Sequence, residues 1–281
     1  MDVNETQSVL LRMYKDIRSI LDCNGIRFYV QYGTAIGALR HDGFIPWDDD
    51  IDLLIWYEDL ERVNDVLSKE LDPALYYYHV PTADNHPHVV WRGDDLESSL
   101  KEKSAPFIDL FPIEPYPEGR IRRALADLFI FGNVGCIWAI DHVSNHAVHR
   151  MLSWSPEFCR RMEHRVCGKT SQTVVFCTNW KTGIFPADSY DEASMHVFED
   201  TEVPLPKNID AMLTSLFGDY MTPPPEDKRT GALGFPCSIL KDWEMRNHRW
   251  GRICTPSSRY GHTPGSSRNP RDCLSPPRNT G

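Results

Sequence analysis

The sequence has no Cys-x-x-Cys pair and no cysteine spacing typical of a zinc site, although it contains eight cysteines. We expect buried free thiols at positions 23, 136, 159, 167, 177, 237, 254 and 273. The start of the chain also lacks the basic residues and the apolar run of a secretory signal. These features together predict a cytoplasmic protein, at the inner face of the membrane if it meets a bilayer.

Basic residues are too few to favour a nucleic-acid partner. The chain has 30 Lys and Arg against 40 Asp and Glu, which gives a formal net charge of −10. An acidic balance of this kind suits divalent cations better than phosphate backbones. The remaining composition, with 41% hydrophobic and 25% charged residues, is that of an ordinary globular protein.

A long hydrophobic run is also missing, because the most apolar stretch, residues 124–140, is short for a membrane span of ~20 residues. Three arginines precede it, at positions 120, 122 and 123. One interpretation is a buried or half-buried helix. The other is a helix on the membrane surface, with its arginines toward lipid phosphates, which would be a peripheral membrane contact.

Helical and strand patterns alternate through the first 111 residues, which predicts the α/β (α+β) class with a sheet at its centre. We expect helices over residues 9–21, 35–39, 58–70, 156–166 and 209–217. We expect strands over residues 26–30, 51–56, 75–80, 88–91, 107–111 and 174–177. Residues 120–169 form a helix-rich insertion in this scheme.

The end of the chain differs in composition from the rest. Residues 251–281 contain five Pro, five Ser and five Arg, but almost no large apolar side chain. Such a segment cannot bury enough surface to offset the entropy of ordering it. We predict a disordered tail after a folded region that covers residues 1–250.

Four aspartates, at positions 48, 49, 50 and 52, precede an apolar strand. Their charges repel one another, so a cation between them is the arrangement that a folded protein tolerates best. A strand places residues two apart on one side, ~6.6 Å along the backbone, so Asp50 and Asp52 project together. Asp48 joins them if the extended backbone starts early enough, whereas Asp49 points away. The alternative is a solvated acidic loop or a set of helix caps.

Asp109 is the expected third metal ligand, because it lies among apolar residues and is costly to bury alone. An ordinary salt bridge is the alternative for Asp109. Mg²⁺ takes oxygen ligands and keeps water and substrate phosphates around it, so two or three carboxylates suit it, with Mn²⁺ as a substitute.

Gly33 and Thr34 follow a strand and predict a turn that approaches a phosphate closely, with backbone amides and a hydroxyl as donors. Arg40 could add a charge-assisted contact to the same phosphate. A plain turn, with Arg40 on the surface, is the alternative. Together with the carboxylates, this arrangement predicts metal-dependent transfer on a nucleotide or another diphosphate.

The motifs Tyr32-Gly33-Thr34, Gly37-Ala38-Leu39-Arg40 and Gly43 to Asp52 resemble the LicD family of phosphotransferases. This family is a branch of the nucleotidyltransferase-fold superfamily and is related to fukutin-type enzymes. Further segments are similar to the family at residues 107–112, 185–187, 198–199, 203–207 and 217–221. The resemblance implies a nucleotidyltransferase-like catalytic domain over residues 1–250, with a central mixed sheet flanked by helices.

The usual activity of that family implies transfer of phosphocholine, or a related phospho-alcohol, from CDP-choline or another CDP-alcohol, with release of CMP. The implied acceptor is a sugar hydroxyl on a glycan or glycolipid precursor of lipopolysaccharide or teichoic acid type. In this scheme Asp50, Asp52 and Asp109 hold Mg²⁺ on the diphosphate. Asp48 supports these ligands or takes the proton of the acceptor.

Two other functions remain open on the sequence alone. One is a nucleotidyltransferase that adds a nucleoside monophosphate to a small molecule or a protein. The other is a non-catalytic nucleotide-binding protein on the same fold. Three histidines near the expected strands, His79, His86 and His88, are interpreted as structural or exposed.

Overall fold

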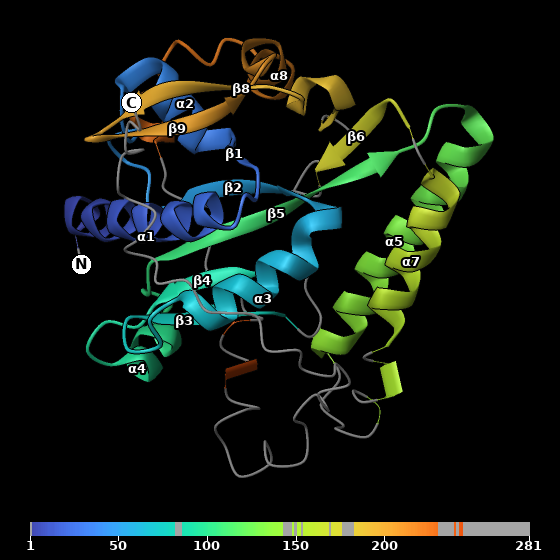
Figure 1. The fold of residues 1–281 in the computed structure, drawn as a ribbon, viewed down its shortest axis with the longest axis horizontal. Coiled ribbons are helices and arrows are strands. Elements are labelled where there is room, and N and C mark those ends of the chain that lie inside the picture. Colours follow the sequence, from blue (N-terminus) through green and yellow to red (C-terminus); the bar gives the residue numbers. More distant parts are fainter. Residues whose placement is uncertain are drawn as a thin grey trace, which may run out of the picture.

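A mixed β-sheet with helices packed around it organises the chain (Figure 1). The structure is a computed structural model, and it describes residues 2–81, 86–142, 148, 151–152, 154–168, 170–175, 183–229, 239 and 242–243. The predicted tail, residues 251–281, lies outside the described residues, as do Cys177, Cys237, Cys254 and Cys273. The α/β class with a central mixed sheet is confirmed.

The helices and strands alternate as the sequence pattern predicts. The helices are α1 (Val3–Cys23), α2 (Tyr32–His41), α3 (Leu60–Glu70), α4 (Leu96–Lys101), α5 (Arg120–His142), α7 (Ser155–Cys167) and α8 (Ile209–Phe217). The strands are β1 (Phe28–Val30), β2 (Ile51–Trp56), β3 (Tyr76–His79), β4 (His88–Trp91), β5 (Phe107–Tyr116), β6 (Gln172–Val175), β7 (Ile184–Pro186), β8 (Ala193–Phe198) and β9 (Thr201–Pro206). Short 3-10 helices cover Tyr57–Asp59, Ala187–Tyr190 and Glu226–Lys228.

The long strand β5 lies at the centre of the sheet. The strand order is β1-β2-β5-β4-β3, and β6 joins β5 to β7, while β8 and β9 form a separate hairpin. Only β2 and β5 run parallel among these pairs, and their register places Asp52 opposite Asp109. Neighbouring strands lie ~4.8 Å apart, so these two acids come from adjacent positions on the sheet.

Helices α1 and α3 cover one face of the sheet. Ile17 of α1 and Val63 of α3 belong to the same buried cluster as Leu53 of β2. Side chains alternate along a strand, so Asp52 and Leu54 point to the opposite face. Leu54 indeed belongs to a second buried cluster that excludes both helices. The side of β2 that faces away from α1 and α3 is therefore the side that carries the acids.

Several boundaries differ from the predictions. Helix α2 begins at Tyr32, which has a positive φ of 51°, so Gly33 and Thr34 lie in its first turn rather than in a turn before it. Strand β5 continues to Tyr116 because its second half gains β6 as a partner. The hairpin of β8 and β9 was not expected. Strand β9 contains two prolines, which are tolerated only at sheet edges, so the local sequence pattern did not indicate a strand.

Helices α5 and α7 pack side by side at one end of the sheet, on the right in Figure 1. By length and composition, Arg120–Ile140 is long and apolar enough to cross a membrane, and 22% of its most apolar stretch is buried. This 21-residue segment is longer than residues 124–140, the apolar run that the sequence analysis judged short for a membrane span. Of the four described cysteines, all are free but only Cys167 is buried, so the expectation of buried thiols is wrong for Cys23, which is exposed.

Candidate active site

The acidic loop between α2 and β2 is held in place by side chains from distant parts of the chain. Gln7 Nε2 of α1 donates hydrogen bonds to the carbonyls of Ile45, at 3.1 Å, and of Asp48, at 2.9 Å. Glu199 accepts a hydrogen bond from the amide of Phe44 at 3.0 Å. These contacts fix the backbone that presents the aspartates, so the acids do not form a freely solvated loop.

The first turn of α2 lies directly against this loop. A Cβ added at Gly33 would lie 2.5 Å from Asp48 Oδ2, so only glycine allows Asp48 its present position. The Thr34 hydroxyl accepts a hydrogen bond from the amide of Asp52 at 3.0 Å and is buried. Thr34 therefore ties α2 to β2, and the donors that the helix start offers to an anion are its first backbone amides.

Asp50, Asp52 and Asp109 come together on one side of β2 and β5. Asp52 and Asp109 are register partners, and their exposed fractions are 7% and 8%. Burial, as the largest cause, and the charges of Asp48 and Asp109 together raise the pKa of Asp50 to about 8. The structure thus brings together the three residues that the sequence analysis assigned to the metal, although their role as ligands stays a prediction.

Asp48 and Asp50 are coupled through a hydrogen bond between their carboxyl groups. Burial, as the largest cause, and the charge of Asp49 raise the pKa of Asp48 to about 6, against the opposing charge of Arg40. Sharing a proton relieves the repulsion between the two acids. A divalent cation would relieve it as well, and a donor set made only of carboxylate oxygens fits Mg²⁺ or Mn²⁺.

Arg40 is half-buried at the end of α2. Its Nη1 donates to the carbonyl of Tyr220 and its Nε lies 3.0 Å from His41 Nε2. Burial lowers the pKa of Arg40, and the charge of Asp48 opposes this shift. The guanidinium group is therefore not a free surface cation but a group held near the acids, and its contact with a phosphate stays a prediction.

Gln31 is a site residue that the sequence analysis missed. It is fully buried, and neither polar atom of its side chain has a hydrogen-bond partner among the described residues. Its backbone amide donates to the carbonyl of Asp52 at 3.4 Å, so it lies at the end of β1 beside the acids. A buried amide without partners is costly and suggests a polar ligand. The signal in the sequence was its place directly before Tyr32.

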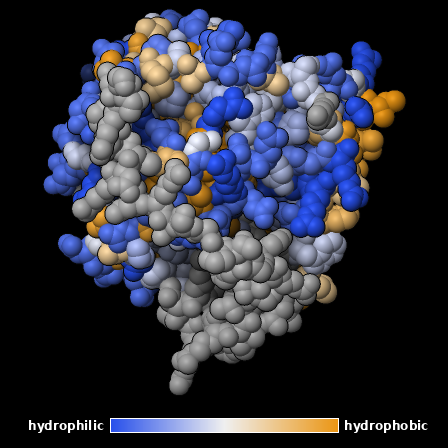
Figure 2. All heavy atoms as spheres, in the orientation of Figure 1, coloured by the Kyte–Doolittle hydropathy of each residue, from blue (hydrophilic) through white to orange (hydrophobic). Residues whose placement is uncertain are grey.

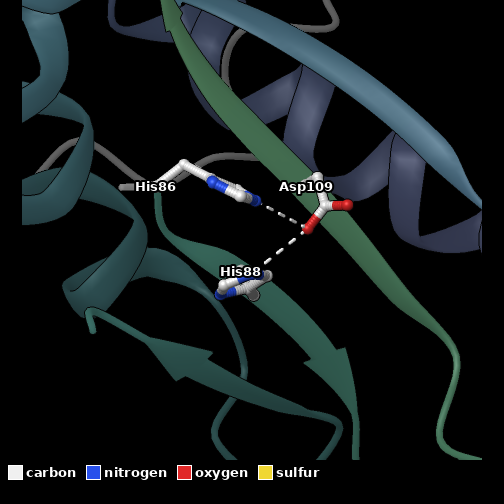
Figure 3. A group of neighbouring side chains, drawn as sticks. All are labelled: His86, His88 and Asp109. Carbon is white, nitrogen blue, oxygen red and sulfur yellow. Dashed lines mark hydrogen bonds and ion pairs between the residues drawn. The ribbon is translucent and has the colours of Figure 1, made fainter. Parts of the chain in front are cut away.

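A row of histidines continues the acids across the sheet, and it was also missed. His88 of β4 is the register partner of Asp109, and His79 of β3 is the register partner of His88. His86 Nε2 and His88 Nε2 lie 3.3 Å and 3.2 Å from Asp109 Oδ1 (Figure 3). Of the two interpretations given for these histidines, structural or exposed, the exposed one is wrong for His79 and His88, which are fully buried.

The electrostatics of this row keep His88 neutral. Burial lowers its pKa well below the usual value, and the neighbouring charges of His86 and His79 act in the same direction. A neutral imidazole is a metal ligand or a hydrogen-bond partner, not a cation that compensates Asp109. His88 therefore does not form an ordinary salt bridge with Asp109, whereas His86, at 3.3 Å from the same oxygen, leaves that alternative open.

The fold and the carboxylates together define an α/β domain with a clustered-acid centre beside a helix start. Residues 25–127 match the protein family described as LicD/FKTN/FKRP, nucleotidyltransferase domain. Over these residues the chain is similar to the LicD-family nucleotidyltransferase domain, and the resemblance drawn from the sequence motifs is confirmed.

Individual relatives extend this match to different lengths. The chain is 24% identical over 250 residues to the lipopolysaccharide cholinephosphotransferase LicD of Haemophilus influenzae, which covers 80% of this chain and 93% of that protein. It is 28% identical over 100 residues to the ribitol 5-phosphate transferase FKRP of Homo sapiens, which covers 34% of this chain and 18% of that protein. An uncharacterised protein of Rickettsia prowazekii is 40% identical over 58 residues.

Proposed function

We propose that the chain is a phosphotransferase that moves phosphocholine, or a related phospho-alcohol, from a CDP-linked donor to a sugar hydroxyl of a cell-surface glycan precursor. One observation carries this proposal: Asp50, Asp52 and Asp109 share one side of the parallel strands β2 and β5, beside the start of α2. Two relatives, a lipopolysaccharide cholinephosphotransferase and a ribitol 5-phosphate transferase, support the same type of reaction.

The three aspartates are the residues that would hold Mg²⁺, or Mn²⁺ in its place. When bound, such an ion offsets the negative charge that grows on the leaving phosphate. The amides of the first turn of α2 would bind phosphate oxygens, because a helix start favours anions. Gln31 adds an unpartnered amide at the same place, suited to a polar group of the nucleotide.

The transfer itself requires one bond to form and one to break. The acceptor hydroxyl oxygen bonds to the phosphorus that carries the alcohol, and the bond from that phosphorus to the bridging oxygen of the diphosphate breaks. CMP leaves with the electron pair of that bond. Asp48 is the residue proposed to take the hydroxyl proton, because a pKa of about 6 keeps it mostly ionised yet basic near neutral pH.

Product analysis tests this proposal. The full chain is incubated with Mg²⁺, a glycan precursor and either CDP-choline or CDP-ribitol, and the reaction is followed by CMP release and by the mass of the glycan. We expect CMP together with a glycan heavier by one phospho-alcohol. A product that carries a nucleoside monophosphate would select nucleotidyl transfer instead, and nucleotide binding without any product would select the non-catalytic alternative.

The outer face of α5 supports a location at the membrane. Six apolar side chains on it are exposed: Ile121, Leu125, Leu128, Phe131, Val134 and Trp138. Figure 2 shows apolar surface at the edge of the molecule where α5 and α7 lie in Figure 1. The adjacent helix α7 carries charged residues, so we propose that the pair lies on an anionic bilayer at its cytoplasmic face rather than crossing it.

A further inference from the structure

We infer that His86, His88 and Asp109 form a second metal site, distinct from the Asp50 and Asp52 cluster, that takes a divalent ion of the zinc class. The ligand atoms of these three residues lie within 4.8 Å of one another. Figure 3 shows both imidazole rings directed at the same carboxylate oxygen. This inference does not depend on which reaction the chain catalyses.

The distances suit an ion between these groups. Two ligand atoms at ~2.1 Å from one ion lie about 3.0 Å apart in octahedral geometry and about 3.4 Å apart in tetrahedral geometry. The separations of Asp109 Oδ1 from His86 Nε2, 3.3 Å, and from His88 Nε2, 3.2 Å, fall between these values.

The hydrogen bonds behind His88 favour a bare nitrogen on its metal side. Asp242 Oδ2 lies 2.9 Å from His79 Nε2, and His79 Nδ1 lies 3.0 Å from His88 Nδ1. If His79 donates to Asp242, it accepts the N–H of His88 Nδ1, which leaves a lone pair on His88 Nε2. Metal-ligating histidines commonly donate their other N–H to such a partner, which fixes the ring.

The opposite proton arrangement would leave a buried N–H of His88 without an acceptor. A doubly protonated His79 would donate to His88 and place an N–H on His88 Nε2. That nitrogen is buried and makes no hydrogen bond among the described residues, although Asp109 Oδ1 is 3.2 Å away. The carboxylate oxygen is close but out of line, where a second ligand of a shared ion would lie. A cation satisfies both the nitrogen and the oxygen.

The donor set distinguishes this site from the aspartate cluster. Two imidazole nitrogens and one carboxylate oxygen suit Zn²⁺, Co²⁺, Fe²⁺ or Mn²⁺, whereas Mg²⁺ prefers oxygen ligands alone. The second oxygen of Asp109 points away from both rings in Figure 3. Asp109 is therefore placed to hold the histidine-bound ion through Oδ1, while its other oxygen remains available to the ion proposed between Asp50 and Asp52.

Cobalt binding to the full chain tests this assignment. Metal-stripped protein is dialysed against Co²⁺ in excess Mg²⁺, and bound cobalt is counted and followed by its visible spectrum. We expect one Co²⁺ per chain, displaced by Zn²⁺. His86→Ala and His88→Ala should each weaken binding at least tenfold, and Asp242→Asn about tenfold. His196→Ala, on β8, is the matched control and should bind as the unchanged chain does.

Two variants keep the test decisive. His86 is partly exposed, with 14% of its side chain accessible, so His86→Ala should fold even if the buried His88→Ala does not. Asp50→Asn should keep the cobalt, because Asp50 is not a ligand of this ion. The proposal is overturned if the chain retains no Co²⁺, if both histidine variants bind it unchanged, or if Asp50→Asn alone loses it.

Discussion

Two regions of the molecule depart from ordinary packing in opposite directions. The side of the sheet away from α1 and α3 buries ionisable groups, with Asp52, Asp109, His88 and His79 in one row across four strands. The outer face of α5 instead exposes large apolar groups, with Trp138 at 62% and Leu128 at 63% exposure. Both arrangements cost free energy in an isolated chain.

The comparison separates two kinds of ligand that would lower this cost. Buried like charges are relieved by a cation or by a shared proton, so the sheet side is suited to small polar ligands. An uncharged stripe of exposed apolar side chains is relieved by a large apolar surface, such as a bilayer. Removing a charge from the first region should therefore stabilise the protein and stop its chemistry, whereas adding a charge to the second should change only where the protein binds.

Asp50→Asn is expected to have the largest effect. The substitution removes a carboxylate that the metal requires, so CMP release from the CDP-linked donor should fall at least ~1,000-fold. It also removes a buried carboxyl group whose pKa is raised by burial and by the charges of Asp48 and Asp109. The metal-free protein should therefore gain on the order of 1 kcal/mol in free energy of unfolding. Enzyme assays and urea unfolding measure the two effects.

Asp49→Asn is the matched control for that substitution. It removes the same charge from the neighbouring residue, whose side chain is expected to point away from the metal. It should keep most of the rate. If Asp50→Asn retains more than a tenth of the activity, or if both variants lose activity equally, Asp50 is not a ligand.

Gly33→Ala tests how closely α2 must approach the acids. The added Cβ would lie 2.5 Å from Asp48 Oδ2, so the carboxylate must move by about 1 Å, which we expect to slow turnover roughly 10- to 100-fold. Stability should change little, because alanine is a better helix former than glycine. Steady-state kinetics and thermal unfolding are the measurements.

Gly135→Ala in α5 provides the comparison, because nothing lies within 4 Å of its added Cβ. This variant should keep its full rate and gain up to ~1 kcal/mol in stability. Equal rates for the two alanine variants would show that the position of Asp48 does not matter for catalysis.

The sequence was sufficient for the acidic half of the site but not for the rest. Asp52 and Asp109 could be paired because each lies near the start of an apolar strand, and the parallel pair places them in register. His88 and Gln31 could not be found in this way. Their importance arises from the strand register of β4 and from the end of β1, which depend on contacts between residues far apart in the chain.

Proline positions and helix packing explain the structural errors in the same terms. The strands β5 and β9 contain prolines, which local patterns exclude from strands, and only pairing with β6 and β8 shows that they are extended. The exposed face of α5 was visible as an apolar run, yet the sequence could not show which side of that run α7 covers. Burial on one side depends on the tertiary packing of the helix pair.

Leu128→Glu tests the apolar region directly. The side chain is 63% exposed, so the substitution should leave folding intact but remove apolar contact with a bilayer. We expect binding to phosphatidylglycerol-containing vesicles to weaken ~10-fold, since a leucine contributes about 1.5–3 kcal/mol on burial. Vesicle sedimentation measures the change, and activity on a soluble acceptor should stay the same.

Val197→Glu serves as the control for vesicle binding. Val197 lies on β8 and is 53% exposed, so it places the same charge on an apolar surface position away from α5. It should bind vesicles as the unchanged chain does. Equal losses in both variants, or no vesicle binding by the unchanged chain, would contradict a membrane role for α5.

Glu163→Gln separates buried acids that serve the site from one that serves only packing. Glu163 of α7 is 1% exposed, and burial, with the charge of Glu114, raises its pKa to about 9. Between pH ~4.5, its value in an unfolded chain, and pH 9, folding takes up a proton, so stability falls as the pH rises through this window. Glutamine removes that dependence and should add on the order of 1–3 kcal/mol at pH 8, measured by urea unfolding, without altering the rate.

Glu157→Gln, whose acid is exposed and paired with Arg161 at 2.8 Å, should change stability by less than ~0.5 kcal/mol. An equal pH slope in the unchanged chain and in Glu163→Gln would mean that Glu163 is ionised in the fold, and the sheet side would then be the sole region in which buried carboxyl groups are held protonated.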